Sequence, residues 1–192
     1  MKVTLERLLQ QGACREAISI YSKQREQDGL ILVNTLIDGT SPLLFDISEL
    51  TRLIWANWLI VRVMSHENAV RYAIYAAESV IGLFEKKYRD NERPRRAIEE
   101  AKVWLAQKTP AAARAAACAA YAAAYAADAA CAAYAAYAAA YAAAYAADAA
   151  AYAAYAVCAA CDAAAPAIKD EWATALKKLL KYGLSILKEE SS

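Results

Sequence analysis

The chain has 192 residues, with 22 basic and 21 acidic side chains and a formal net charge of +1. This length is sufficient for one domain with a hydrophobic core, and the balanced charge excludes a strong electrostatic attraction to nucleic acid or to an anionic membrane. The charged segment Met1–Arg7 is not typical of a secretory signal. Five cysteines, an odd number, do not suggest a disulfide framework, so we expect reduced thiols and a cytoplasmic protein.

Apolar residues recur at helical spacing through the first 110 residues. The pattern predicts helices over residues 3–10, 14–26, 30–37, 46–64, 67–88 and 94–107. Segment 30–37 would also suit a strand on local signal alone, but no partner strand appears elsewhere in the sequence, so a helix is predicted. Asp46 followed by Glu49 resembles a capping box, which makes Asp46 the predicted N-cap.

The helix predicted over residues 46–64 has a broad apolar surface. Leu53, Ile54 and Val61 share one face, and Ile60 widens it beyond a single stripe. We therefore expect this helix to be buried on two sides.

Residues 111–165 form an alanine-rich tract in which 38 of 55 residues are alanine. Alanine has the best helix propensity of all residues, so the tract is predicted to be helical. Residues 129–147 lack charge over a length that could span a membrane. They contain no Leu, Ile, Val or Phe, however, and we expect no membrane partner.

Two polar stripes run along this tract on opposite sides of the predicted helix. The first stripe comprises Arg114, Cys118, Tyr121, Tyr125 and Asp128. The second comprises Tyr134, Tyr137, Tyr141, Tyr145, Asp148, Tyr152 and Tyr155. Either the helix breaks near Asp128, which would then act as an N-cap, or one unbroken helix contacts different neighbours with its two sides. We favour at least one break, because an unbroken helix would be about 80 Å long.

Alanine and tyrosine together favour close helix packing, with tyrosine rings between the helices. The tyrosines are then either core and rim residues or a recognition surface for a partner. Pro166 ends the tract, and the last helix, starting at Lys169 or Asp170, has an apolar face that would close the bundle. The predicted fold is all-α, a helical bundle or stacked helical hairpins. Its segments 1–110, 111–165 and 166–192 are expected to form one folded unit.

Few residues carry a recognisable chemistry. His66 is the one histidine in the sequence; no catalytic motif surrounds it, and we expect it to be exposed. Cys158 and Cys161 share a helix face but have no second ligand pair, so we predict small buried thiols and no metal. Asp128 and Asp148 lie among tyrosines, where their carboxylates would accept hydrogen bonds.

A basic run at the start of the helix 94–107 has two possible roles. Arg93, Arg95 and Arg96 with Glu78 and Glu99 could form an ion-pair network or an arginine surface for an anion. No residue pattern in the chain indicates catalysis or a cofactor, so we expect a protein that is not an enzyme and needs none.

Residues 71–78 (RYAIYAAE) and 93–104 (RPRRAIEEAKVW), followed by the Ala/Tyr/Asp tract, resemble the alanine-rich immunity proteins of bacterial toxin–immunity loci and phage genomes. The resemblance covers roughly residues 50–165. It implies a small helical protein of the bacterial host cytoplasm that neutralises a partner by binding. Glu78, Arg93, Arg95, Glu99 and Trp104 match the family pattern and have structural roles in this interpretation.

Three functions follow from these observations. The leading hypothesis is a phage or mobile-element protein that sequesters a toxin or antiphage defence protein. The first alternative is a sponge for a small nucleotide immune signal, with tyrosines stacking on bases and Arg93, Arg95 or Arg114 holding phosphates. The second alternative is an ice-binding or purely structural helical protein. A homo-oligomer formed through Ala/Tyr faces is also possible.

Overall fold

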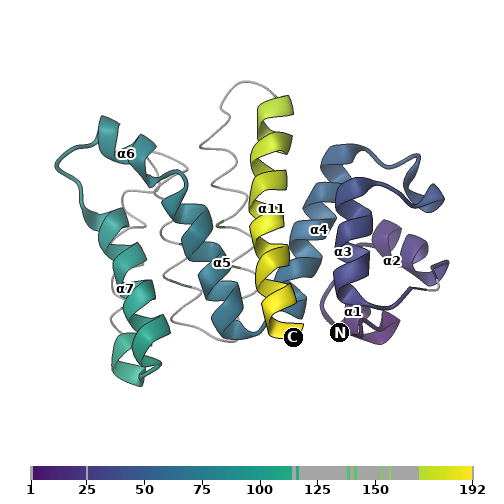
Figure 1. Ribbon diagram of the computed structural model, residues 1–192, viewed down its shortest axis with the longest axis horizontal. Coiled ribbons are helices and arrows are strands. Elements are labelled where there is room, and N and C mark those ends of the chain that lie inside the picture. The colour runs from purple at the N-terminus through teal and green to yellow at the C-terminus, as the bar shows by residue number, and fades with distance from the viewer. Residues whose placement is uncertain are drawn as a thin grey trace.

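The chain is all-α (Figure 1). This computed structural model describes residues 2–24, 26–113 and 169–191, together with Ala116, Ala138, Tyr141, Tyr152 and Ala156. Within these residues the elements are α1 (Leu5–Gln10), α2 (Arg15–Ser22), α3 (Gly29–Asp38), η1 (Pro42–Leu44), α4 (Glu49–Val63), α5 (His66–Glu78), α6 (Ile81–Lys87), α7 (Arg93–Gln107) and α11 (Lys169–Ser191). The same residues contain no strand, only an isolated antiparallel bridge between Lys2 and Asp28.

Short polar side chains begin most of these helices. Thr4, Asp28 and Ser65 each accept a hydrogen bond from a backbone N–H in the first turn of α1, α3 and α5. At α4 the prediction of Asp46 as N-cap was wrong. Ser48 is the N-cap, because its hydroxyl accepts from the Thr51 N–H, and the chain still turns at Asp46 after η1.

Two predicted helices are shorter than expected. The helix predicted over 67–88 divides into α5 and α6, since the Ser79 hydroxyl donates to the Ala76 carbonyl at 2.7 Å and Val80 leaves the helical conformation at φ −127°. The helix predicted to Glu26 ends at Ser22. The segment that follows α2 lies beside the N-terminus instead, because the Gln27 carbonyl accepts a hydrogen bond from the Val3 N–H at 2.7 Å.

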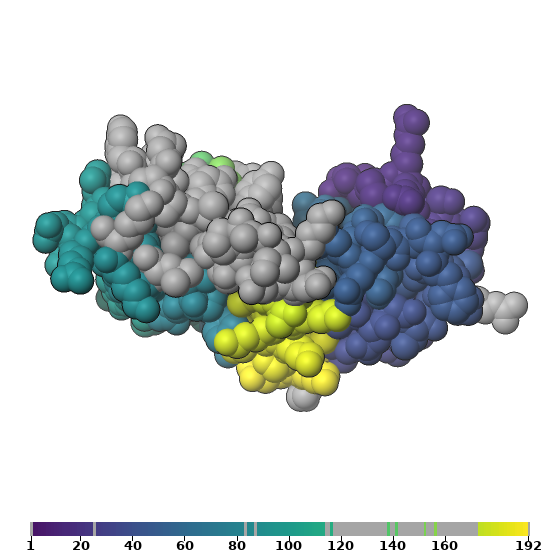
Figure 2. All heavy atoms as spheres, turned by 90° about the horizontal axis from the view of Figure 1, so that it is seen from above, coloured from purple at the N-terminus to yellow at the C-terminus, as the bar shows by residue number. Residues whose placement is uncertain are grey.

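Helix α11 occupies the centre of the fold and contacts α3, α4 and α5. On one side of it α3 packs against α4, with α1 and α2 beyond; on the other side α7 packs against α5 (Figure 1). The view from above shows the same order, with α7 near one end and α1 and α2 near the other (Figure 2). Leu176, Leu180 and Leu187 are fully buried, as expected for a helix that closes a bundle.

Helix α4 is covered by both α3 and α11, so its predicted burial on two sides is confirmed. Leu53, Ile60 and Val61 are essentially inaccessible to solvent. Ile54 was predicted to share this buried face but is 42% exposed. The buried face includes instead Ala56 and Asn57, which follow Leu53 by three and four residues and so lie on its side of the helix.

The contact between α11 and the α4–α5 pair is unusually close at Gly183. A Cβ atom at this position would lie 2.7 Å from Ile60 Cδ1 and 3.0 Å from Tyr72 Cε2. At the residue directly before Gly183, the ring of Tyr182 stacks on that of Tyr75 with centroids 3.8 Å apart. A residue without a side chain thus lets α11 approach the core, and aromatic rings fill the adjoining space.

Tyr72 carries a hydroxyl into this core. It donates to Asn57 Oδ1 at 3.3 Å, and both residues are almost completely buried. We expect Tyr72→Phe to lower the free energy of unfolding by about 1 kcal/mol, because a buried hydrogen bond is lost while the ring remains. Urea denaturation would measure the change. Tyr182→Phe is the control, since it keeps the stacked ring at a half-buried position; equal losses in the two variants would contradict the prediction.

Three described alanines of the alanine-rich tract belong to the core. Ala116, Ala138 and Ala156 are fully buried. The rings of Tyr141 and Tyr152 lie 4.1 Å apart. Because residues 11 apart rise about 16 Å along a straight helix, these two tyrosines do not lie on one straight helix.

Other predictions for the tract lie outside the described residues. They include the position of a break near Asp128 and the full extent of the two stripes. The residues concerned are Arg114, Tyr121, Tyr125, Asp128, Tyr134, Tyr137, Tyr145, Asp148, Tyr155, Cys158 and Cys161.

Candidate functional site

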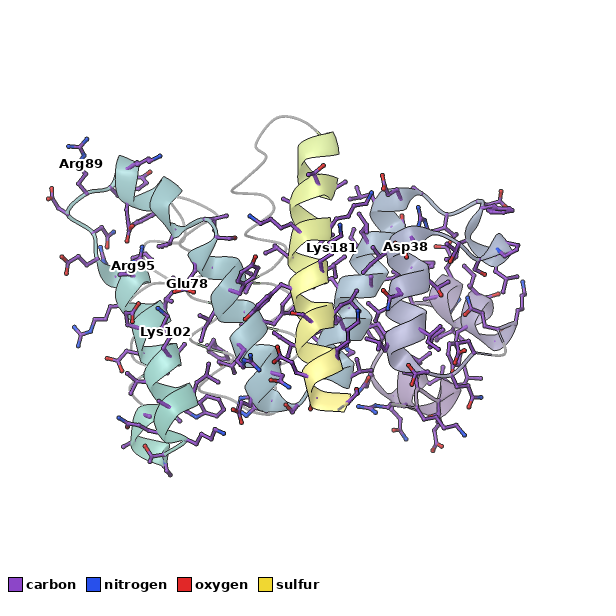
Figure 3. All side chains as sticks on the ribbon, viewed as in Figure 1. Asp38, Glu78, Arg89, Arg95, Lys102 and Lys181 are labelled. Carbon is purple, nitrogen blue, oxygen red and sulfur yellow. The ribbon has the colours of Figure 1, made fainter. Side chains whose placement is uncertain are left out.

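The candidate site is the outer surface of α6, α7 and the loop 88–92 between them, at one end of the molecule (Figure 3). This loop is fixed from both sides. The ring of Tyr88 lies 4.8 Å from the buried ring of Phe84, and the Tyr88 N–H donates to the Phe84 carbonyl. On the α7 side, Asn91 Oδ1 accepts from the backbone N–H of Arg93 at 3.4 Å and from its Nε at 3.0 Å. The loop therefore has a defined conformation.

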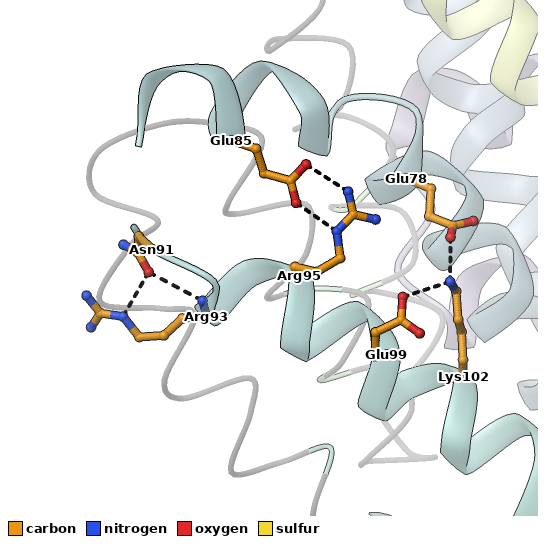
Figure 4. A network of polar contacts seen from close by, with 7 residues as sticks. All are labelled: Glu78, Glu85, Asn91, Arg93, Arg95, Glu99 and Lys102. Atoms are coloured by element: carbon orange, nitrogen blue, oxygen red, sulfur yellow. Dashed lines mark hydrogen bonds and ion pairs between the residues drawn. The ribbon is translucent and has the colours of Figure 1, made fainter. Parts of the chain in front are cut away.

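Arg95 joins α7 to α6. Its Nε donates to Glu85 Oε1 at 2.7 Å and its terminal nitrogen to Glu85 Oε2 at 2.9 Å, a two-point pairing drawn in Figure 4. These hydrogen bonds from Arg95 lower the pKa of the Glu85 carboxyl, and the carboxylate in turn raises the pKa of Arg95. Two-point pairing fixes the orientation of a guanidinium as well as its position, so the two helices are held in register.

Lys102 joins α7 to α5. Its Nζ lies 2.7 Å from Glu78 Oε1 and 2.9 Å from Glu99 Oε1 (Figure 4). Hydrogen bonds to Glu78 and then to Glu99 raise the pKa of Lys102. The ammonium therefore stays charged at neutral pH, and one lysine holds two carboxylates in place between α5 and α7.

The far end of α7 is attached to the start of α5. The rings of Trp104 and His66 lie 4.5 Å apart, and Lys108 forms an ion pair with Glu67. His66 was predicted to be exposed, which was wrong. It is half-buried because it is the first residue of α5 and its ring packs on Trp104.

Five residues matched the family pattern in the sequence, and all five lie on α5 or α7. These two helices and α6 are here called the α5–α7 layer. Glu78, Glu99 and Trp104 each join or brace the α5–α7 pair, and Arg95 braces the α6–α7 pair. Arg93 holds the loop. Their partners Glu85, Asn91 and Lys102 were not predicted from the sequence. Only Lys102 had a local signal, three residues after Glu99; Glu85 lies ten residues before Arg95, on another helix.

Several charges remain directed at solvent. Arg89 projects from the tip of the loop (Figure 3), and Arg93 and Arg96 are exposed at the start of α7. Among the described residues, neither Arg89 nor Arg96 has an ion-pair partner within 4.0 Å. Arg95, by contrast, already uses two of its nitrogens on Glu85. The exposed arginines Arg89, Arg93 and Arg96, here called the α7 arginine edge, can contact an acidic surface.

No group of metal-ligating side chains was found within the part of the chain that the structure describes. In the same part, no helix is long and apolar enough to cross a bilayer.

The fold and the site thus define an all-α protein with a braced helical layer and a charged outer edge. The family model for the "Imm-5 like putative immunity protein" matches residues 60–181. This is well over half of the chain, and the chain belongs to that family. The resemblance predicted from the sequence is confirmed, and the match includes α5, α6, α7 and the first half of α11. No curated protein and no solved structure matches the chain.

The two-point pairing of Glu85 with Arg95 predicts how the free energy of unfolding changes in acid. Because the folded-state pKa of Glu85 is lowered, its stabilising contribution is present above the ordinary glutamate pKa of about 4.3 and is lost as pH falls through the lowered value. Glu85→Gln should therefore reduce the free energy of unfolding at pH 7, by less than about 1 kcal/mol for a half-exposed pair. The difference from wild type should shrink in strong acid.

Urea denaturation across this pH range would test the prediction. Glu92→Gln is the matched control, because Glu92 is exposed and has no ion pair with the described residues. A difference between Glu85→Gln and wild type that stayed constant with pH would contradict the assignment.

Proposed function

We propose that this chain is a non-catalytic immunity protein that neutralises a bacterial toxin or an antiphage defence protein by binding to it. Membership of the immunity protein family, across residues 60–181, is the observation that supports this most strongly. The matched region contains the whole α5–α7 layer. The proposed binding surface is the α7 arginine edge, in the best-braced part of that layer.

The bracing supports a role in recognition. Arg95 and Lys102 hold α7 against α6 and α5 with short charged contacts of 2.7–2.9 Å. A surface fixed before binding loses less conformational entropy on association than a mobile one. The α7 arginine edge would accelerate encounter with a partner of opposite charge. We therefore expect the partner to present an acidic surface.

The first experiment isolates this partner. The tagged full-length chain would be purified from its native bacterial host, and any protein that co-elutes in 1:1 ratio would be expressed alone. We expect that protein to arrest growth of a bacterial culture, and co-expression of the chain to restore growth. A co-eluting protein without toxic effect, or one whose toxicity the chain leaves unchanged, would contradict the proposal.

A further inference from the structure

A separate pocket lies at the other end of the molecule, between α1, α2, α3 and α4. Its volume is about 330 Å³, and all of its described lining residues fall between Val3 and Leu59. The family match begins at residue 60, so the pocket lies outside the matched region. It is also distant from the α7 arginine edge, since α7 and α1–α2 occupy opposite sides of α11 (Figure 1).

The walls of the pocket are apolar and aromatic. The lining includes Trp55 and Trp58 from α4, Ile20 from α2, and Leu32 and Leu36 from α3. Leu32 is almost fully buried, whereas Ile54 at the same pocket is 42% exposed, so the cavity extends from the core to the surface. Among the lining residues that the structure describes, none has a formally charged side chain. The charges that adjoin this wall lie behind its lining: the Arg62 guanidinium is 4.0 Å from the centroid of the Trp58 ring, and the charge of Glu26 acts on Tyr21.

Two hydroxyl groups of the wall already have partners. The Tyr21 hydroxyl donates to the Val3 carbonyl at 2.6 Å, and the Thr35 hydroxyl donates to the Ile31 carbonyl at 2.9 Å. Burial, and then the charge of Glu26, raise the pKa of the Tyr21 phenol. That hydroxyl therefore stays neutral and hydrogen-bonded at physiological pH. A ligand would therefore not need to hydrogen-bond with these two hydroxyls.

The side chains at the α2 wall leave the space open. Ala17 lines the pocket from α2 and Ala13 from the preceding turn; a larger residue at either position would fill it. Cavities of about 150 Å³ with such walls hold one benzene ring, and pockets of about 300 Å³ and above are typical of small-molecule sites. A volume of about 330 Å³ corresponds to two rings.

From these observations we propose that the pocket binds an uncharged, apolar small molecule of about two aromatic rings, held between Trp55, Trp58 and Ile20. This binding activity goes beyond the proposed neutralisation of a toxin and involves different residues. The apolar surface buried on both partners would supply the affinity, and the cost of desolvating a charged group against these apolar walls would weaken the binding of ionic analogues.

The test is a titration of the full-length chain with 6-propionyl-2-(dimethylamino)naphthalene, an uncharged two-ring fluorescent probe whose emission moves to shorter wavelength in apolar surroundings. We expect saturable binding of one probe per chain. Ala17→Phe, whose ring would take the space of one of the two ligand rings, should weaken binding by about tenfold or more. Ser19→Phe is the matched control: it adds the same ring to an exposed position of α2 that does not line the pocket. We expect it to bind as wild type does.

A second measurement needs no variant. Cys14 is exposed and lines the pocket, and trypsin releases it in the segment 8–15, which contains no other cysteine. Bound probe should slow the alkylation of Cys14, as measured by mass spectrometry of that peptide.

Three results would overturn the proposal. They are binding that does not saturate, equal affinities in Ala17→Phe and wild type, and unchanged alkylation of Cys14. If the probe does not bind but Ala17→Phe weakens binding of the protein partner, the pocket receives a partner side chain and the small-molecule assignment is wrong. Probe binding that persists when toxin neutralisation fails would leave this proposal intact and contradict only the proposed function.

Discussion

Gly183→Leu is expected to lower the free energy of unfolding by about 3 kcal/mol, the upper part of the range for overpacked cores. At Gly183 even a Cβ atom would lie 2.7 Å from Ile60 Cδ1 and 3.0 Å from the Tyr72 ring. Ile60 and Tyr72 are both fully buried. A leucine side chain would therefore force α11 away from α4 and α5, and the stack of Tyr182 on Tyr75 would be lost with it.

Gly183→Ala should show a smaller effect, because the gain in helix propensity, up to about 1 kcal/mol, offsets part of the steric cost. Ser185→Leu, on the exposed face of the same helix, controls for added hydrophobicity. The midpoint of urea unfolding at constant m-value measures all three. A midpoint for Gly183→Leu equal to that of Ser185→Leu would show that α11 does not approach the core closely.

Reversing the charge of the α7 arginine edge should have the largest effect on partner binding. For Arg89→Glu combined with Arg96→Glu, we expect the affinity for the isolated toxin or defence protein to fall by about 100-fold. Both residues are exposed, and neither participates in the Glu85–Arg95 or Glu78–Lys102–Glu99 contacts. The fold should therefore remain stable while attraction to an acidic surface becomes repulsion.

The matched control is Lys178→Glu with Lys181→Glu. These exposed lysines lie on α11, away from α7 (Figure 3), and their replacement changes the net charge by the same amount. Calorimetric titration of both double variants separates a local contact from an effect of net charge. Similar affinities for the two would place the binding surface elsewhere.

Local sequence signals predicted much of the fold. Helices α7 and α11 were identified from apolar spacing together with Pro94 and the leucines of the last helix, whereas α3 was predicted because residues 30–37 had no partner strand in the sequence. The errors arose where a neighbouring residue competed for the same role. Ser48 replaced Asp46 as N-cap, and the Ser79 hydroxyl ended α5 inside an apparently continuous pattern.

The site was predictable only in part, because its contacts join separate helices. The family pattern identified Arg95 and Glu99, but Glu85 and Lys102 became significant only when α6, α7 and α5 were placed together. The pocket between α1 and α4 gave no sequence signal. In the sequence its lining residues follow an ordinary amphipathic helix pattern. The volume of the pocket depends on how four helices meet.

The central claim is that the chain neutralises its partner by binding alone. The most direct test is to titrate the purified partner with the full-length chain, following both the partner's residual toxic activity and its intact mass. We expect complete inhibition at a 1:1 ratio, toxic activity that returns when the complex dissociates, and an unchanged mass of the partner. Complete inactivation at a small fraction of one equivalent, accompanied by a change in the partner's mass, would contradict it.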